Sequence, residues 1–381
     1  MSIPITQSVI VDPTYHSNKR TEFKLYNKGR FYSPNLRLVD FGVTDIQGNV
    51  NPNFCILGGL NSIIKNISLY FNDILVQQVK DASQYLSIKN TIKPNYTIFR
   101  DLNNNVVGSS VILDTTHDET LKLLKGTSKL TGVLYLSQVF SLLDSMIAAQ
   151  LNLGDINEIR VSIEYETDVN KIFSSEDIPA GFNISQPSII YTEFFNLTGP
   201  TDFKMSVTSV ENERFIVQGN NNKQSIRLRA FDGKTVSNLI CQNLPNNQVS
   251  NLLGYQYSER LNDEKVNFMV NNAVLLNFQG FDNEAKKLVL TAKSMGNHFS
   301  PLLSAMENYN LNAFEGVYDD RLAELAGKLS YLSIDLNRKI NRLDYEVSWA
   351  GADEDNVTVY VFGHVEKTIA KMGDKILTMY A

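Results

Sequence analysis

The sequence predicts an all-β protein made of two β-sandwiches in tandem. Apolar and polar residues alternate over many short segments, which is the period of a half-buried strand. The alternation is clearest over residues 158–166, where Ile159, Val161 and Ile163 share one face. A chain of 381 residues exceeds one ordinary sandwich and suits two of about 170 to 200 residues each. We therefore expect two hydrophobic cores.

Further strands are predicted on both sides of that segment. Residues 63–79 read IIKNISLYFNDILVQQV, in which Asn72 and Asp73 separate two alternating runs and predict a tight hairpin. Residues 330–336 place Leu332, Ile334 and Leu336 on one face, whereas residues 356–362 are apolar on both faces. In the second half, we expect strands at residues 188–197, 202–210, 213–219, 225–231, 266–270, 273–280, 287–292, 331–336, 343–349 and 356–365.

A strand, a helix and a strand follow one another over residues 132–166. The strand-like run 132–137 ends at Ser137, a candidate N-cap, and the apolar residues from Val139 to Leu151 then recur at helical spacing. The second half repeats this order more weakly, with an apolar stripe over Leu302–Met306 and a short helical piece over residues 319–327. The two halves share a pattern of elements but no residue-by-residue repeat.

These segments divide the chain into four parts. Residues 1–20 lack a sustained period and are expected to form an N-terminal arm. The first sandwich is placed at residues 21–170 and the second at residues 188–381, with a linker at residues 171–187 that is rich in Ser, Pro, Asn and Gly.

Composition and charge limit the function classes. The chain is 43% hydrophobic and 20% charged, with a net charge of −6, which argues against a surface built to neutralise nucleic-acid phosphates. The small basic clusters, Lys19 with Arg20 and Lys371 with Lys375, are interpreted as solvated faces. No window holds the roughly 18 apolar residues of a membrane span. The N-terminus lacks the pattern of a secretory signal, so synthesis in the cytoplasm is expected.

The sequence predicts no cofactor and no catalytic residue. Its two cysteines, Cys55 and Cys241, lie in different halves beside apolar neighbours and are interpreted as buried free thiols. The motifs of the common hydrolases, NTPases and metalloproteases are missing. None of the four histidines has a second His or a Cys at a metal-ligand spacing, which favours structural or surface roles for all of them: His16, His117, His298 and His364.

Acidic pairs and the single tryptophan are the remaining candidates for a functional site. Sandwich-fold glycosidases use two carboxylates from separate strands, and the candidate acids are Glu164 with Glu166, Glu211 with Glu213, and the run Asp353, Glu354 and Asp355. The first pair is expected to face solvent, and the last run is a weak candidate for a metal site. Trp349 is interpreted as a core residue rather than a platform for a sugar ring.

The order of these elements resembles one protein family. SPNLRLVDFGV, then GGLNSIIKNISLYFNDILVQQVKDASQYLSIKN, then GVLYLSQVFSLL ahead of a strand, is similar to the first jelly roll of the double jelly-roll major capsid proteins. The similarity is greatest to those of polinton-like viruses and virophages, in a lineage that includes tailless phages and adenovirus. It implies two tandem eight-stranded jelly rolls, whose loop helices correspond to Val139–Leu151 and Leu302–Met306.

The resemblance implies a structural protein of the virion rather than an enzyme. Such a protein assembles as pseudo-hexagonal homotrimers that tile an icosahedral capsid, next to a vertex (penton) protein and minor capsid proteins. The arm of residues 1–20 would then point inward or reach a neighbouring capsomer. Two alternatives stay open: a tandem β-sandwich protein that binds glycans or a cell surface through Trp349, and a sandwich-fold glycosidase.

Overall fold

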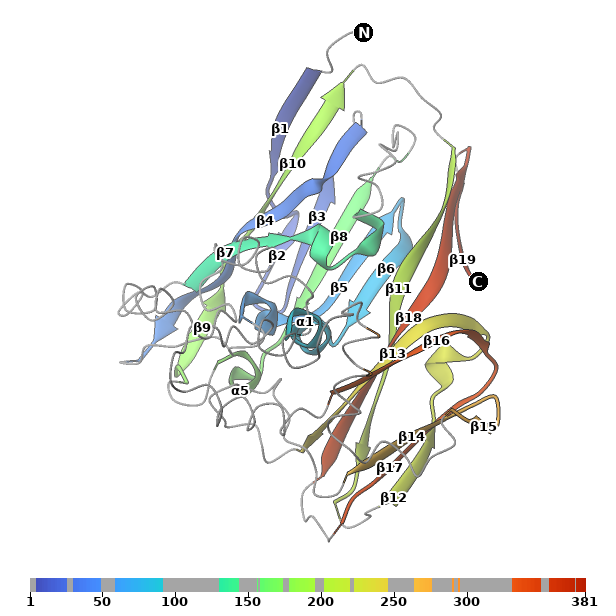
Figure 1. Cartoon of the computed structure of the whole chain (residues 1–381). Coiled ribbons are helices and arrows are strands. Elements are labelled where there is room, and N and C mark those ends of the chain that lie inside the picture. Colours follow the sequence, from blue (N-terminus) through green and yellow to red (C-terminus); the bar gives the residue numbers. More distant parts are fainter. Residues whose placement is uncertain are drawn as a thin grey trace, which may run out of the picture.

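The chain folds into two β-sandwiches built from four antiparallel sheets. The computed structural model describes residues 5–25, 30–48, 59–91, 130–143, 156, 158–173, 178–195, 202–219, 223–245, 264–275, 290, 294, 331–350, 356–373 and 375–381. The sandwich at the upper left of Figure 1 is called roll 1, and the one at the lower right is called roll 2. The predicted all-β class with a few short helices is confirmed.

Roll 1 consists of two sheets, 1A and 1B. In sheet 1A the strands lie in the order β1 (Ile5–Val11), β10 (Ser188–Phe195), β4 (Arg30–Gln47) and β7 (Leu130–Tyr135), and β9 (Gly181–Ile184) also pairs with β4. In sheet 1B the order is β2 (Tyr15–His16), β3 (Arg20–Leu25), β8 (Ile159–Tyr165), β5 (Ile64–Phe71) and β6 (Ile74–Lys80).

Roll 2 consists of sheets 2A and 2B. In sheet 2A the strands lie in the order β11 (Phe203–Val217), β18 (Val357–Met372), β13 (Lys234–Pro245) and β16 (Tyr331–Ile340), and β19 (Lys375–Tyr380) also pairs with β18. In sheet 2B the order is β12 (Lys223–Arg227), β17 (Leu343–Ser348), β14 (Lys265–Val270) and β15 (Ala273–Val274).

The two rolls have the same strand order. Leaving aside β2, β9 and β19, the strands of roll 1 in chain order are β1, β3, β4, β5, β6, β7, β8 and β10, and those of roll 2 are β11 to β18. The first strand of each roll pairs with its last strand, and the second strand with the seventh. This is the Greek-key order of a jelly roll, so the fold implied by the resemblance is confirmed.

Short helices lie between the strands. They are η1 (Gly59–Ile63), α1 (Ala82–Thr91), η2 (Leu136–Gln138), α5 (Val169–Ile172) and η3 (Arg229–Phe231). The helix predicted over Val139–Leu151 falls within the described residues only at 139–143, of which 141–143 are helical. Ser137 lies inside η2 and not immediately before the helical residues 141–143, so its prediction as the N-cap is wrong. The helices predicted at Leu302–Met306 and residues 319–327 lie outside the described residues.

Local patterns predicted several strands correctly. The hairpin of β5 and β6 turns at Asn72 and Asp73, which have φ angles of 46° and 65°. A two-residue turn with both φ angles positive matches the twist of a hairpin, and Asn and Asp tolerate that conformation. The alternating run at 158–166 is β8, and the run at 330–336 forms the start of β16. Residues 202–210 and 213–219 were predicted as two strands but lie mostly in one, β11.

The predicted boundaries of the rolls differ from the strand pairing. Residues 5–11 of the expected arm form β1, which pairs with β10 over its whole length. β10 was assigned to the second sandwich, yet it also pairs with β4 in sheet 1A. Residues 181–184 of the expected linker form β9. Roll 1 therefore extends to Phe195 because its first and last strands close one sheet, which the local pattern of either strand does not reveal.

The central strand of sheet 2A, β18, is buried on both faces along most of its length. On the inner face, Val359 and Val361 belong to the core of roll 2, together with Trp349. On the outer face, Tyr360 and Phe362 belong to a core that is continuous with the interior of roll 1. The apolar pattern on both faces of residues 356–362 therefore reflects a strand that lies between two cores.

The close approach of β18 to η3 provides a test of this packing. A methyl group on Gly363 would overlap the ring of Phe231 and lie 3.3 Å from Leu239 Cδ2, and both side chains are fully buried. We expect Gly363→Ala to lower the free energy of unfolding by about 1–3 kcal/mol through overpacking, measured by urea denaturation. Gly181→Ala is the control, because the added methyl group meets only the flexible end of Gln47. Equal effects of the two substitutions would contradict this account.

Candidate functional site

The acidic pairs are held in structural contacts rather than aimed into a cleft. Glu164 lies on the exposed face of β8 and accepts a hydrogen bond from Asn66 Nδ2 at 2.6 Å. Glu166 Oε1 accepts from the backbone amides of Thr167 at 2.9 Å and Asp168 at 3.2 Å. Glu164 thus bonds to the neighbouring strand β5, and Glu166 bonds to the turn that follows β8.

The second pair, Glu211 and Glu213, is also bound to structural partners. Glu211 accepts a hydrogen bond from the Tyr380 hydroxyl at 2.5 Å and forms an ion pair with Lys234 Nζ at 3.2 Å. These contacts hold β19 against sheet 2A, and burial raises the pKa of Tyr380 so that the phenol keeps its proton. Glu213 accepts from the Ala230 amide at 3.0 Å at the start of η3.

The remaining candidates add no catalytic or metal site among the residues that the structure describes. Asp353, Glu354 and Asp355 lie outside the described residues. Within the described ranges, no group of three or more His, Cys, Asp or Glu side chains is placed to hold a metal ion. Trp349 is only 5% exposed and packs in the core of roll 2, as the sequence predicted. No helix among the described residues is both long and apolar enough to cross a membrane.

The two histidines among the described residues take part in structural hydrogen bonds. His16 joins β2 to its neighbours through Thr21 Oγ1 at 2.8 Å and the carbonyl oxygen of Ile184 at 3.2 Å. His364 Nε2 lies 2.8 Å from the Tyr85 hydroxyl. His117 and His298 lie outside the described residues, as does Cys55, whereas Cys241 is a buried free thiol as predicted.

The two rolls are joined by a contact that combines buried apolar, aromatic and polar side chains. On the side of roll 1, strand β6 lies against β11, and α1 faces the outer side of sheet 2A (Figure 1). The residue Lys367 is 5% exposed, and its amine donates a hydrogen bond to the carbonyl oxygen of Val76 at 2.7 Å. Burial lowers the pKa of this amine. Gln77 Nε2 donates to the carbonyl oxygen of Thr208 at 3.0 Å.

Helix α1 contributes the aromatic part of this contact. The Tyr85 ring packs on Phe362 with 5.5 Å between the ring centroids and meets His364 edge to face. Gln84 is hydrogen-bonded to Gln242 of β13. Burial raises the pKa of Tyr85 above its usual range, so its hydroxyl stays protonated and is available to the imidazole.

The edge of the contact is charged, and one small cavity remains inside it. At the edge, Asp81 accepts from Asn212 Nδ2 at 2.7 Å and pairs with Arg214 Nη1 at 3.1 Å. The cavity of ≈ 160 Å³ has Gln77 on its roll 1 side and Thr208 on its roll 2 side. Ligand sites for drug-sized molecules usually measure about 300–1,000 Å³, so this cavity suits a few water molecules better than a ligand.

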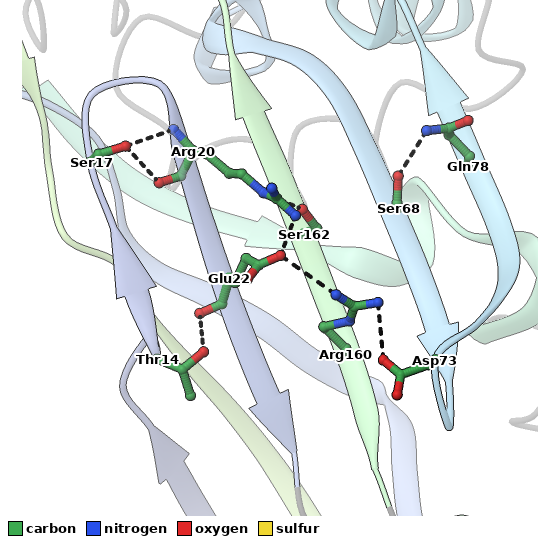
Figure 2. Close-up of polar contacts among 9 residues, drawn as sticks. All are labelled: Thr14, Ser17, Arg20, Glu22, Ser68, Asp73, Gln78, Arg160 and Ser162. Carbon is green, nitrogen blue, oxygen red and sulfur yellow. Dashed lines mark hydrogen bonds and ion pairs between the residues drawn. The ribbon is translucent and has the colours of Figure 1, made fainter.

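The outer face of sheet 1B carries a different kind of surface (Figure 2). Glu22 pairs with Arg20 and lies 3.7 Å from Arg160, which in turn lies 3.3 Å from Asp73. Arg20 Nε also donates to Ser162 Oγ at 3.2 Å. These ion pairs form within the chain, and exposed pairs of this kind contribute only about 0–1 kcal/mol each.

Comparison with known proteins identifies solved structures that have the same architecture. No family model matches the chain, and no curated protein matches it in sequence. Among solved structures, it is similar to a chain of the Sputnik virophage at a TM-score of 0.60 and 10% identity, covering 99% of this chain and 88% of that one. It is also similar to the Faustovirus major capsid protein, at a TM-score of 0.56 and 7% identity, covering 97% of this chain and 90% of that one.

A third similarity is to the mavirus major capsid protein, at a TM-score of 0.52 and 11% identity, covering 98% of this chain and 90% of that one. At these identities the likeness establishes the fold and not the activity. The chain is a double jelly-roll protein, with the same architecture along nearly its whole length as these viral major capsid proteins.

The packing of Tyr85 provides a test of the contact between the rolls. We expect Tyr85→Phe to lower the free energy of unfolding by about 0.5–1.5 kcal/mol, because the ring stays while the hydrogen bond to His364 is lost. Tyr85→Ala should cost about 3–5 kcal/mol, because it also empties the space beside Phe362. Urea denaturation measures both, with Tyr15→Phe, at a tyrosine 53% exposed, as the control. Equal effects of the two Tyr85 variants would show that the ring contributes nothing.

Proposed function

We propose that this chain is a major capsid protein, a structural component of a virion that assembles with copies of itself into an icosahedral shell. The observation that carries the proposal is the whole-length likeness to major capsid proteins, with both rolls matched. The described side chains agree with it, because the candidate acids are bound in structural contacts and buried hydrogen bonds join one roll to the other.

The assembly unit in this proposal is a homotrimer. Two rolls of the same strand order lie side by side in each chain, so three chains around an axis present six similar units. Such a ring has a pseudo-hexagonal outline and tiles a flat facet from one gene product. The roll–roll contact supports this unit because it fixes both halves in one orientation before assembly.

The proposal also covers location and partners. In this proposal, the chain is synthesised in the host cytoplasm and incorporated into the capsid. There it contacts other copies of itself, a vertex protein and minor capsid proteins. Recognition of a specific nucleic-acid sequence is not part of the role, because the net charge of −6 does not favour phosphate binding.

The two alternative functions receive less support. A glycan-binding site built on Trp349 lacks its platform, because that side chain is 5% exposed within the core of roll 2. A glycosidase built on Glu211 lacks a free carboxylate there, because this group bonds to Tyr380 and Lys234.

The mass of the assembled species tests the proposal. We expect light scattering after size-exclusion chromatography to give about three times the chain mass of 42.9 kDa, and negative-stain images to show particles with a hexagonal outline. A chain that stays monomeric at high protein concentration, with no larger assembly in the images, would overturn the proposal. Binding to a glycan array by such a monomer would favour the binding protein instead.

A further inference from the structure

Strand β19 is lightly anchored although it reaches the contact between the rolls. It pairs with β18 along its whole length, with Tyr380 opposite Lys367, and it lies beside that strand in Figure 1. Of its six residues only Ile376 is buried, whereas most residues of β18 are buried. A strand with few buried apolar side chains opens locally at a lower free energy than the core of a protein. Strand β19 can therefore detach while both rolls stay folded.

The end of β19 contacts the lysine that links the two rolls. The Lys367 amine donates to the carbonyl oxygen of Val76 in roll 1, and it lies 5.3 Å from the centroid of the Tyr380 ring. The Lys234 amine lies 4.2 Å from the centroid of the same ring. Aromatic ring faces attract ammonium groups, most strongly where water is excluded. Tyr380 thus stabilises the charge on Lys367 from β19, while Val76 accepts its hydrogen bond from roll 1.

The hydroxyl of Tyr380 holds an acid near the same lysines. It donates to Glu211 at 2.5 Å, and the other oxygen of this carboxylate pairs with Lys234 at 3.2 Å. Glu211 belongs to β11, the strand of roll 2 that lies against β6. Burial lowers the pKa of the Lys367 amine, the Glu211 carboxylate opposes this effect, and Lys234 adds to it. The buried amine therefore depends on the groups that Tyr380 positions.

Backbone hydrogen bonds keep Tyr380 in this position. The amide of Ala381 donates to the carbonyl oxygen of Glu366 on β18 at 3.1 Å, and its carbonyl oxygen accepts from the amide of Thr235 on β13 at 2.9 Å. The end of β19 is thus fixed between two strands of sheet 2A. The Tyr380 ring reaches its lysines only while these bonds are made.

We infer that β19 is a releasable strap for the contact between the rolls: when docked it holds Lys367 on Val76 through the Tyr380 ring, and its release loosens roll 1 from roll 2. This inference goes beyond the proposed function, because it concerns a single chain and holds whatever the chain assembles into. A strand with one buried side chain thereby controls a contact between two large cores, which makes it a conformational switch.

A reversible lock on the strap tests this coupling. Thr368 and Met379 face each other on β18 and β19, on the opposite side of the sheet from the neighbouring pair Lys367 and Tyr380. Facing residues of antiparallel strands have Cα atoms about 4.5–5.5 Å apart, which a disulfide can bridge. The variant carries Thr368→Cys and Met379→Cys in a chain with Cys55→Ser; the remaining Cys241 is buried.

Amide hydrogen exchange, measured by mass spectrometry on the full chain, compares the oxidised and reduced forms of this variant. We expect the β6 peptide to exchange at least tenfold more slowly in the oxidised form, because its opening requires release of the strap. The β8 peptide, from the core of roll 1, gives the general effect of the disulfide and should slow less. Equal β6 rates in the two forms, or a slowing no greater than that of β8, would overturn the inference.

Substitutions test whether Lys367 carries the effect. Tyr380→Ala should speed β6 exchange at least tenfold in the otherwise native chain and clearly less in a Lys367→Met chain, because coupled residues are not additive. Tyr380→Phe keeps the ring and should have a smaller effect. Met379→Ala is the matched control, because Met379 is 51% exposed on the other face of the same strand. Equal effects of Tyr380→Ala in the two chains, or of Met379→Ala and Tyr380→Ala, would overturn the inference.

Discussion

The burial of strand β18 on both faces is the constraint on which the architecture depends. If one face of sheet 2A were solvated, the two jelly rolls would be connected only by the polypeptide chain. Instead, strand β18 contributes side chains to two cores. Its Val359 and Val361 side chains fill roll 2, and its Tyr360 and Phe362 side chains extend the core of roll 1. Full burial of a large apolar side chain contributes about 1.5–3 kcal/mol, so these side chains stabilise either the core of roll 2 or the contact between the rolls. The two rolls are therefore held as one rigid block.

Polar groups in the contact fix how the rolls are oriented. Apolar surfaces alone tolerate sliding, but a buried donor that loses its acceptor costs about 1–3 kcal/mol. The Lys367 amine and the Gln77 amide each bond to a backbone carbonyl of the opposite roll. A shift of one roll along the other breaks these bonds together, so a single arrangement is selected. An assembling unit needs this property because its outer surfaces must stay in a fixed relation.

The sequence predicted the elements whose signals are local. The hairpin of β5 and β6 is encoded by two turn residues, and β8 by its own alternation, so both were found. The sequence did not predict strand β13, because its polar residues Gln242 and Asn243 occupy buried positions where an apolar residue would be expected. Their partners, Gln84 and Tyr345, come from distant parts of the fold. Tertiary contacts of this kind leave no periodic trace in the sequence.

The division into rolls failed for a related reason. β1 and β10 belong together only because Val9 pairs with Tyr191 and Ile10 with Ile190, and neither segment signals its partner. The candidate site was anticipated mainly by exclusion: the sequence argued against catalysis and placed Trp349 in the core. It did not reveal the contact between the rolls, whose residues Gln77, Tyr85 and Lys367 fit no motif and acquire their roles only from the packing of one sheet on another.

In a tandem pair of similar domains that contact each other head to tail, each domain uses only one of its two contact surfaces. The internal contact uses the fifth strand of one roll and the outer face of the other. A two-fold dimer matches each surface with itself. In a closed ring, each of the two surfaces of one copy contacts the other surface of a neighbouring copy, so both are covered in every copy. The proposed homotrimer is of this cyclic kind.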